Sequence, residues 1–134
     1  MEESIFTKII KGEIPCYKVY EDDQTFAFLD NDPLSDGHVL VVPKKQVNKI
    51  YDLDDETYKA LFAAVKKVCH QIEDVLGVRA GLVVEGLGVP HAHVHVVPMY
   101  DGDVLQLHHG YPVDKSEDNM KRLADKLYFE AGGD

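Results

Sequence analysis

The stretch that most constrains the fold of this chain runs from Pro90 to Pro98 and alternates histidine with small or β-branched residues. Side chains two residues apart on a β-strand point to the same face. His91, His93 and His95 would therefore project together over a span of roughly 13 Å. Proline donates no hydrogen bond to a neighbouring strand, so the two prolines predict a strand over 91–97. One face of this strand would be apolar, and the other would carry the three histidines.

A second strand is predicted just before this one, over the apolar run 81–85. The connection between the two strands is the short loop of Gly86, Leu87, Gly88 and Val89. Glycine lets a backbone approach a ligand closely, so the N–H groups of this loop could bind an anion.

The rest of the chain predicts an α+β domain with an antiparallel sheet of about five strands and two main helices. Turn residues between two β-rich runs indicate a hairpin at 17–29, and the continuous apolar run after His38 indicates a strand buried on both faces. Apolar residues at steps of three and four predict helices over 4–12, 52–77 and 116–129. The irregular stretch 99–113 contains a pair, His108 and His109, that is expected to be solvent-exposed.

Length and charge limit the class of protein. The 134 residues suit one domain, with a core over about 4–98 and a variable C-terminal segment over 99–134. The net charge of -10 argues against a nucleic-acid polymer or an anionic membrane surface as partner. The sequence has no apolar run of the ~18 residues that a membrane span needs, and no signal peptide, so an intracellular, cytoplasmic protein is expected.

Three alternating histidines allow three interpretations. They could ligate a metal ion, because imidazoles spaced by one residue on a strand can chelate. They could act as nucleophile and general acid, because the pKa of imidazole lies close to neutrality. They could also be three surface residues, but the strict alternation between apolar residues and the glycine loop in front make this the weakest interpretation.

The run from His91 to Val97 resembles the signature of the histidine triad, or HIT, family of nucleotide hydrolases and transferases, in which three histidines alternate with apolar residues. All seven places of that signature are filled. The resemblance extends over about residues 4–98, and it implies a HIT-like fold whose sheet continues across a homodimer.

The resemblance also implies roles for the histidines. The middle histidine, His93, would be the nucleophile that takes up the nucleotide as a covalent intermediate, and it is also the one with a neighbour on each side. His95 would bind a phosphoryl oxygen or the leaving group. His91, and His38 as the family's fourth histidine, would complete the orienting network.

Further residues match positions that bind the nucleotide in the family. Asp30 ends a predicted strand eight residues before His38 and would accept hydrogen bonds from the ribose hydroxyls, although a role confined to the turn is the alternative. The purine pocket would be walled by Phe28 and Asn31 together with Ile5, Phe6 and Ile9. The backbone of 86–89 would contact the phosphate.

The sequence departs from the family at two places. Many members hold a structural zinc ion through Cys-x-x-Cys and a further histidine, but here those positions are Ser4, Thr7 and Gln46, so neither a metal nor another cofactor is expected. Leu87 replaces a polar residue, and Ala80 stands where many relatives have an asparagine. Any contact to phosphate from these positions would therefore be lost or come from the backbone.

The resulting hypothesis is a hydrolase that cleaves a phosphoramidate or phosphoanhydride bond at the α-phosphate of a purine nucleotide, an AMP or GMP conjugate. The alternative within the family is a dinucleoside polyphosphate hydrolase or nucleotidyltransferase that uses the same histidine. Two alternatives come from other classes. They are a metalloprotein with His91, His93 and His95 as ligands, and a nucleotide-binding module without turnover.

Overall fold

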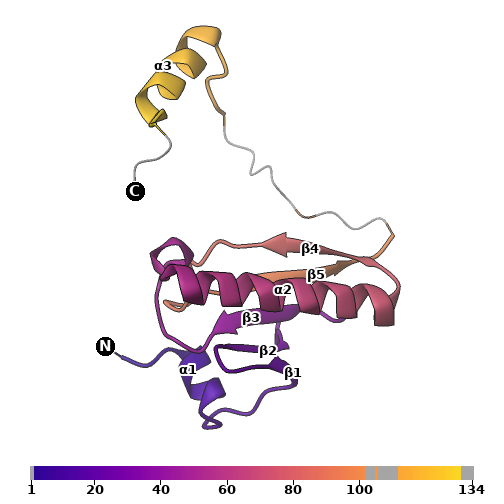
Figure 1. Ribbon diagram of the computed structural model, residues 1–134. Coiled ribbons are helices and arrows are strands. Elements are labelled where there is room, and N and C mark those ends of the chain that lie inside the picture. The colour runs from indigo at the N-terminus through magenta and orange to yellow at the C-terminus, as the bar shows by residue number, and fades with distance from the viewer. Residues whose placement is uncertain (1, 102–104, 106–111, 131–134) are drawn as a thin grey trace.

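A computed structural model describes residues 2–101, 105 and 112–130 of the chain. Five antiparallel strands form one sheet in the order β1-β2-β3-β5-β4, and helices pack on both of its faces (Figure 1). This architecture confirms the predicted α+β class. The elements are α1 (Ile5–Ile10), β1 (Lys18–Glu21), β2 (Thr25–Leu29), β3 (Val39–Pro43), the short 3-10 helix η1 (Ile50–Asp52), α2 (Asp55–Leu76), β4 (Arg79–Val83), β5 (Val94–Met99) and α3 (Glu117–Leu127).

The long helix α2 covers one face of the sheet because its apolar stripe matches the inward side chains of the central strands. Asp54 caps the start of α2 by accepting a hydrogen bond from the backbone of Thr57, and Gly77 ends the helix in the left-handed conformation. The helix begins at Asp55, three residues after the expected bound, because η1 ends at Asp52 and Asp54 has the extended backbone of a cap. The main core lies here, between α2 and alternate residues of β2, β3 and β5 such as Ala27, Val41 and Val94.

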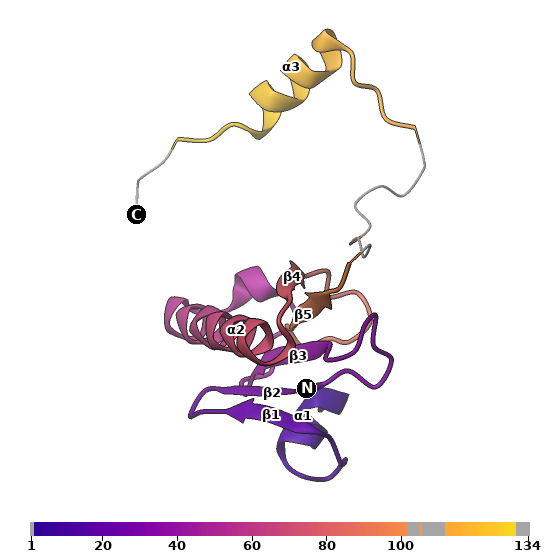
Figure 2. The ribbon, with the colours of Figure 1, turned by 90° about the vertical axis from the view of Figure 1, so that its right-hand side faces the viewer.

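The short helix α1 lies on the opposite side of the sheet (Figure 2). Phe6 and Ile9 of α1 pack with Phe26, Phe28 and Leu40, which are the side chains of β2 and β3 that point away from α2. All five residues of β3 are buried, as expected for a strand that is covered on both faces.

The bounds predicted for the last two strands were wrong. β4 ends at Val83 rather than at residue 85, and β5 begins at Val94 rather than at residue 91. The ladder between β3 and β5 starts at the pair Val41 and Val94, because Pro43 at the end of β3 has no N–H to offer and its carbonyl oxygen is bound by the ring of His91. At the other end β5 continues to Met99 beside β4 alone.

Pro98, which was predicted to end this strand, therefore lies inside it. Pairing between β3 and β5 stops at Val96, so Pro98 lies beyond the last pair on that side of the strand. A proline is tolerated where a neighbouring strand requires no donor.

The C-terminal helix α3 is capped by Ser116, and none of its residues is buried. Figures 1 and 2 both show it apart from the sheet. His108 and His109 lie outside the described residues. None of the described helices is long and apolar enough to span a membrane.

Candidate active site

The three alternating histidines lie on the face of the sheet that carries α1. The ring of Phe6, at the start of α1, is 5.7 Å from the ring of His91 and 5.1 Å from that of His93, between centroids. The rings of His93 and His95 are also 5.1 Å apart. The three imidazoles thus follow one another on a common face, although only His95 belongs to the regular strand.

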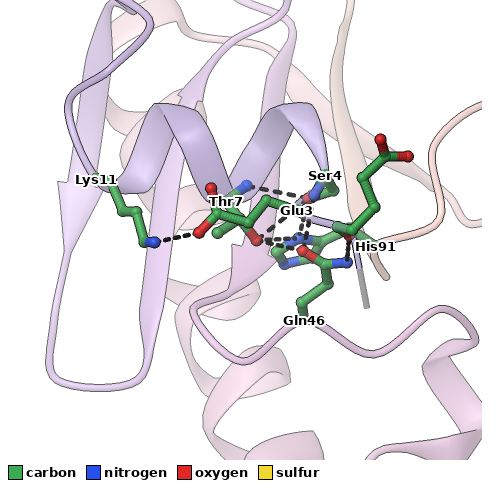
Figure 3. A network of polar contacts seen from close by, with 7 residues as sticks. Glu3, Ser4, Thr7, Lys11, Gln46 and His91 are labelled. Atoms are coloured by element: carbon green, nitrogen blue, oxygen red, sulfur yellow. Dashed lines mark hydrogen bonds and ion pairs between the residues drawn. The ribbon is translucent and has the colours of Figure 1, made fainter.

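His91 is fully buried and held by side chains from two distant segments (Figure 3). Its Nε2 lies 2.7 Å from the carbonyl oxygen of Pro43, which can only accept, so Nε2 carries the proton. Its Nδ1 then accepts a hydrogen bond from the Ser4 hydroxyl, at 2.7 Å. Gln46 closes the network, because its Oε1 accepts from the Ser4 amide at 2.8 Å and from the Thr7 hydroxyl at 2.6 Å.

This network occupies the place where the family resemblance would put structural zinc. Ser4, Thr7 and Gln46 offer only neutral hydroxyl and amide oxygens, whereas zinc sites in proteins use thiolate, imidazole and carboxylate. The donor set therefore does not fit zinc. In this chain, Ser4 bonds to both Gln46 and His91, and Thr7 bonds to Gln46. These hydrogen bonds connect α1 to the segment that leads into β5.

Replacement of Ser4 by alanine should lower the free energy of unfolding by about 2 kcal/mol or more, because it removes both the cap of α1 and the nearer donor to the buried Nδ1 of His91. Urea denaturation followed by circular dichroism measures this change. Ser4→Thr keeps the hydroxyl and is the control, with an expected loss below about 1 kcal/mol. Equal stability of Ser4→Ala and the wild type would show that the network contributes nothing.

The contacts of His93 determine which of its nitrogens is protonated. Its Nδ1 lies 2.7 Å from the backbone carbonyl oxygen of His91. A carbonyl oxygen can only accept, so Nδ1 carries the proton and Nε2 of the neutral ring has a free lone pair. The position and protonation of His93 therefore suit a nucleophile whose reactive atom is Nε2.

A second chain of hydrogen bonds fixes the tautomer of His95. The backbone N–H of Leu34 donates to Nδ1 of His38, at 3.0 Å, so the proton of the neutral His38 ring is on Nε2. This Nε2–H donates to Nδ1 of His95, at 2.9 Å. The remaining nitrogen of His95, Nε2, consequently carries a proton and can donate it.

Burial keeps these rings neutral. It is the main cause that lowers the pKa of the His38, His91 and His95 imidazoles below the ordinary value for histidine. The hydrogen-bond directions given above are those of the neutral rings, so lowered pKa values maintain them at neutral pH.

Asp30 lies beside the His38–His95 pair at the end of β2. One carboxylate oxygen accepts a hydrogen bond from the backbone of Asp32, and the other lies 3.6 Å from Nε2 of His38 and 3.9 Å from Nδ1 of His95. The carboxylate is partly exposed and lines a cavity of about 810 Å3 together with both histidines. The carboxylate is thus accessible to a ligand.

The ligand atoms of Asp30, His38 and His95 all lie within 4.8 Å of one another, which is close enough to surround a metal ion. The hydrogen bond from Leu34 argues against that use, because it leaves the proton of neutral His38 on the nitrogen that would have to bind the metal. The triad itself does not form a metal site either, since both ring nitrogens of His91 already have partners. This geometry gives no support to the interpretation of the triad as metal ligands.

The residues predicted to wall the purine pocket divide into two groups. Phe6, Ile9 and Phe28 are buried together, with the rings of Phe6 and Phe28 5.6 Å apart, and they form an apolar wall next to His93. Ile5 and Asn31 are exposed to solvent.

The loop predicted to contact phosphate precedes the triad as expected. Gly86 has a positive φ of 70°, which other residues rarely adopt, and Leu87 and Gly88 are exposed. Val89 accepts a hydrogen bond from the backbone of His91, at 2.8 Å, and this contact ties the loop to the histidines.

Several contributors to the site could not be identified from the sequence. The amide of Leu34 and the carbonyl of Pro43 are backbone groups, which leave no mark on a side-chain pattern. Lys49, Ile50 and Tyr51 line a cavity next to His93. A 3-10 helix of this length is too short to show a periodicity that would point to a site.

Comparison with known proteins agrees with this geometry. A family model described as HIT domain matches residues 11–102. The adenosine 5'-monophosphoramidase HNT1 of Candida albicans is 33% identical over 94% of this chain and 90% of its own length, and an uncharacterized HIT-like protein of Borreliella burgdorferi is 33% identical over 95% and 97%. The crystal structure of the histidine triad nucleotide-binding protein from Candida albicans matches with a TM-score of 0.77 at 30% identity, over 93% of this chain and 94% of that one. The chain belongs to the HIT family.

Proposed function

We propose that this protein hydrolyses phosphoramidates of purine nucleotides through a nucleotidyl intermediate on His93. The observation that carries the proposal is the hydrogen bond from Nδ1 of His93 to the carbonyl of His91, which leaves Nε2 free to attack phosphorus. A relative that is 33% identical over most of its length is named an adenosine 5'-monophosphoramidase, which agrees with this reaction.

In the first step, the lone pair on Nε2 of His93 attacks the α-phosphorus and forms a P–N bond. The bond from phosphorus to the amine breaks as the amine takes up a proton from solvent water, and the Nε2–H of His95 donates a hydrogen bond to the departing nitrogen. In the second step, water attacks the phosphorus, the bond from phosphorus to Nε2 of His93 breaks, and a proton returns to solvent, which releases the nucleoside monophosphate and free His93. Backbone amides near Gly86 would stabilise the charge on the phosphoryl oxygens.

The nucleoside would bind on the α1 side of the histidines. The rings of Phe6 and Phe28, with Ile5, Ile9 and Asn31, would contact the purine. The carboxylate of Asp30 would accept hydrogen bonds from the ribose hydroxyls, because one of its oxygens faces the cavity beside His38 and His95.

Product analysis tests the proposal. The purified protein should release AMP from adenosine 5'-phosphoramidate and GMP from the guanosine analogue, in the presence of EDTA as well as in its absence. Faster cleavage of a diadenosine polyphosphate, or transfer of the nucleotide to a second phosphate compound, would favour the alternative activities within the family. Tight binding of AMP without any release of product would indicate a binding module instead.

We also propose that the sheet continues across a homodimer through the free edge of β4. The two edges of the sheet differ, because Lys18 and Glu21 of β1 form an ion pair at one edge while Leu82 of β4 and the adjoining Val84 are about half exposed at the other. Charged residues discourage edge pairing, whereas an exposed apolar edge favours it.

Sedimentation should therefore give the mass of a dimer for the wild type. The double variant Leu82→Lys/Val84→Lys should shift it toward the monomer, whereas Val19→Lys on the opposite edge strand should leave it unchanged. A wild type that sediments as a monomer at all concentrations would rule out this assembly.

A further inference from the structure

The side chain of Gln46, just after β3, is held against the start of α1 (Figure 3). Its Oε1 accepts from the backbone N–H of Ser4 and from the hydroxyl of Thr7, and its Nε2 donates to the carbonyl oxygen of Glu2, at 2.8 Å. A backbone amide can only donate and a carbonyl oxygen can only accept, so the side-chain amide has one possible orientation. None of the reaction steps proposed above uses Gln46.

This orientation orders the protons of two hydroxyls beside His91. The hydroxyl oxygen of Thr7 lies 2.6 Å from Oε1 of Gln46 but 3.4 Å from Nδ1 of His91, so its single proton goes to Gln46. The Ser4 hydroxyl lies 2.7 Å from the same Nδ1 and is therefore the donor to His91. The ring proton of His91 stays on Nε2, which donates to the carbonyl oxygen of Pro43.

The segment 43–47, which contains Gln46, also holds the triad through its backbone. The carbonyl oxygen of Pro43 accepts from the ring of His91, at 2.7 Å. The carbonyl oxygen of Val47 accepts from the backbone N–H of Ala92, at 2.7 Å. Two hydrogen bonds on either side of Gln46 thus fix the position of residues 91 and 92 relative to this segment.

The bond to Ala92 reaches the nucleophile through a single peptide group. The carbonyl of His91 and the N–H of Ala92 belong to one planar unit, so they rotate together. Val47 binds the N–H of this unit, and Nδ1 of His93 donates to its carbonyl oxygen, at 2.7 Å. A hydrogen bond at one side of a peptide group polarises it and strengthens the bond at the other side. A shift of segment 43–47 would therefore move or weaken the contact that leaves Nε2 of His93 unprotonated.

We propose that Gln46 is a positioning residue for the nucleophile. Its side chain anchors segment 43–47 to α1, the segment orients the peptide group between His91 and Ala92, and that group fixes the ring and the tautomer of His93. The inference rests on the proposed function and adds a residue that acts on the reaction through other residues.

Replacement of Gln46 by methionine tests this role, because methionine has a similar length but lacks the amide. The value of kcat for adenosine 5'-phosphoramidate should fall about tenfold, since a small misplacement of a reacting group is costly, and KM should change by less than about twofold. Gln46→Glu retains an oxygen acceptor for Ser4 and Thr7 and should recover most of kcat. Thr7→Val removes one of the two donors to Gln46 and should give a smaller fall in kcat.

Ile72→Val provides a control for loss of stability. Ile72 is a buried residue of α2 in the core on the opposite face of the sheet, so its truncation loosens the packing without touching the 43–47 segment. This variant should keep the wild-type kcat. Circular dichroism checks the folding of each variant, and Thr7→Val takes the place of Gln46→Met if the latter does not fold.

The nitrogen chemical shifts of His93 give a second readout that does not depend on turnover. They should indicate protonation at Nδ1 in the wild type and a mixture of tautomers in Gln46→Met. The spectrum of Ile72→Val should match that of the wild type. A loss of stability alone would leave the tautomer of His93 unchanged.

The outcomes separate this inference from the function on which it rests. Wild-type kcat in folded Gln46→Met, a rise in KM alone, or an equal fall of kcat in Ile72→Val would overturn the positioning role and leave a phosphoramidate hydrolase standing. A wild type that hydrolyses no phosphoramidate would overturn the proposed function. The shifts of His93 would then decide the positioning role, which a mixture of tautomers in Gln46→Met supports and an unchanged spectrum overturns.

Discussion

Replacement of His93 by asparagine should lower kcat/KM for adenosine 5'-phosphoramidate by about 10⁴-fold or more, because it removes the nucleophile. The asparagine amide can still donate to the carbonyl of His91, where Nδ1 of the imidazole donates now. The variant therefore lacks Nε2 but keeps the local hydrogen bond. Steady-state release of AMP measures the loss, and His93→Ala should show a loss of the same order.

His70 provides the control for this experiment. It is an exposed histidine on α2, far from the triad in sequence and on the helix that covers the opposite face of the sheet. His70→Asn should keep full activity, and circular dichroism should show that all three variants are folded. Undiminished turnover by His93→Asn would rule out His93 as the nucleophile.

Replacement of His38 by phenylalanine should lower kcat by about 10- to 100-fold with a smaller effect on KM. The hydrogen bond from Nε2 of His38 is the contact that assigns the proton of His95 to Nε2, where the leaving group needs it. Without this donor, neutral His95 can adopt the other tautomer. His38 acts in this way as a positioning residue.

Two further measurements separate positioning from a merely structural effect. The nitrogen chemical shifts of His95 should indicate protonation at Nε2 in the wild type and a mixture of tautomers in His38→Phe. His38→Gln, whose amide retains a donor, should recover part of the activity. Wild-type kcat in a folded His38→Phe variant would contradict the proposed relay.

The sequence was sufficient for the architecture because the signals for it are local. The caps Ser4 and Asp54, the helix-ending Gly77 and the unbroken apolar run of β3 each reflect interactions with near neighbours in the chain, so the local sequence indicates the elements directly. Alternation of the histidines likewise predicted that their rings would share one face.

The errors and omissions have a different origin, because they depend on contacts between residues far apart in the sequence. The strand was expected to begin at His91, but the partners of that ring are Ser4 and the carbonyl of Pro43, which lie 87 and 48 residues away. No pattern within residues 90–98 contains this information. The amide of Leu34 was missed for a related reason, since a backbone donor has no side-chain signature.

The most direct test of a covalent intermediate is the stereochemical course at phosphorus. A phosphoramidate made chiral by one sulfur atom, hydrolysed in ¹⁸O-labelled water, reports whether displacement occurs once or twice. Attack by His93 followed by attack of water involves two in-line displacements, so the product should show retention of configuration. Inversion would mean a single direct attack by water, and it would contradict the central role of His93.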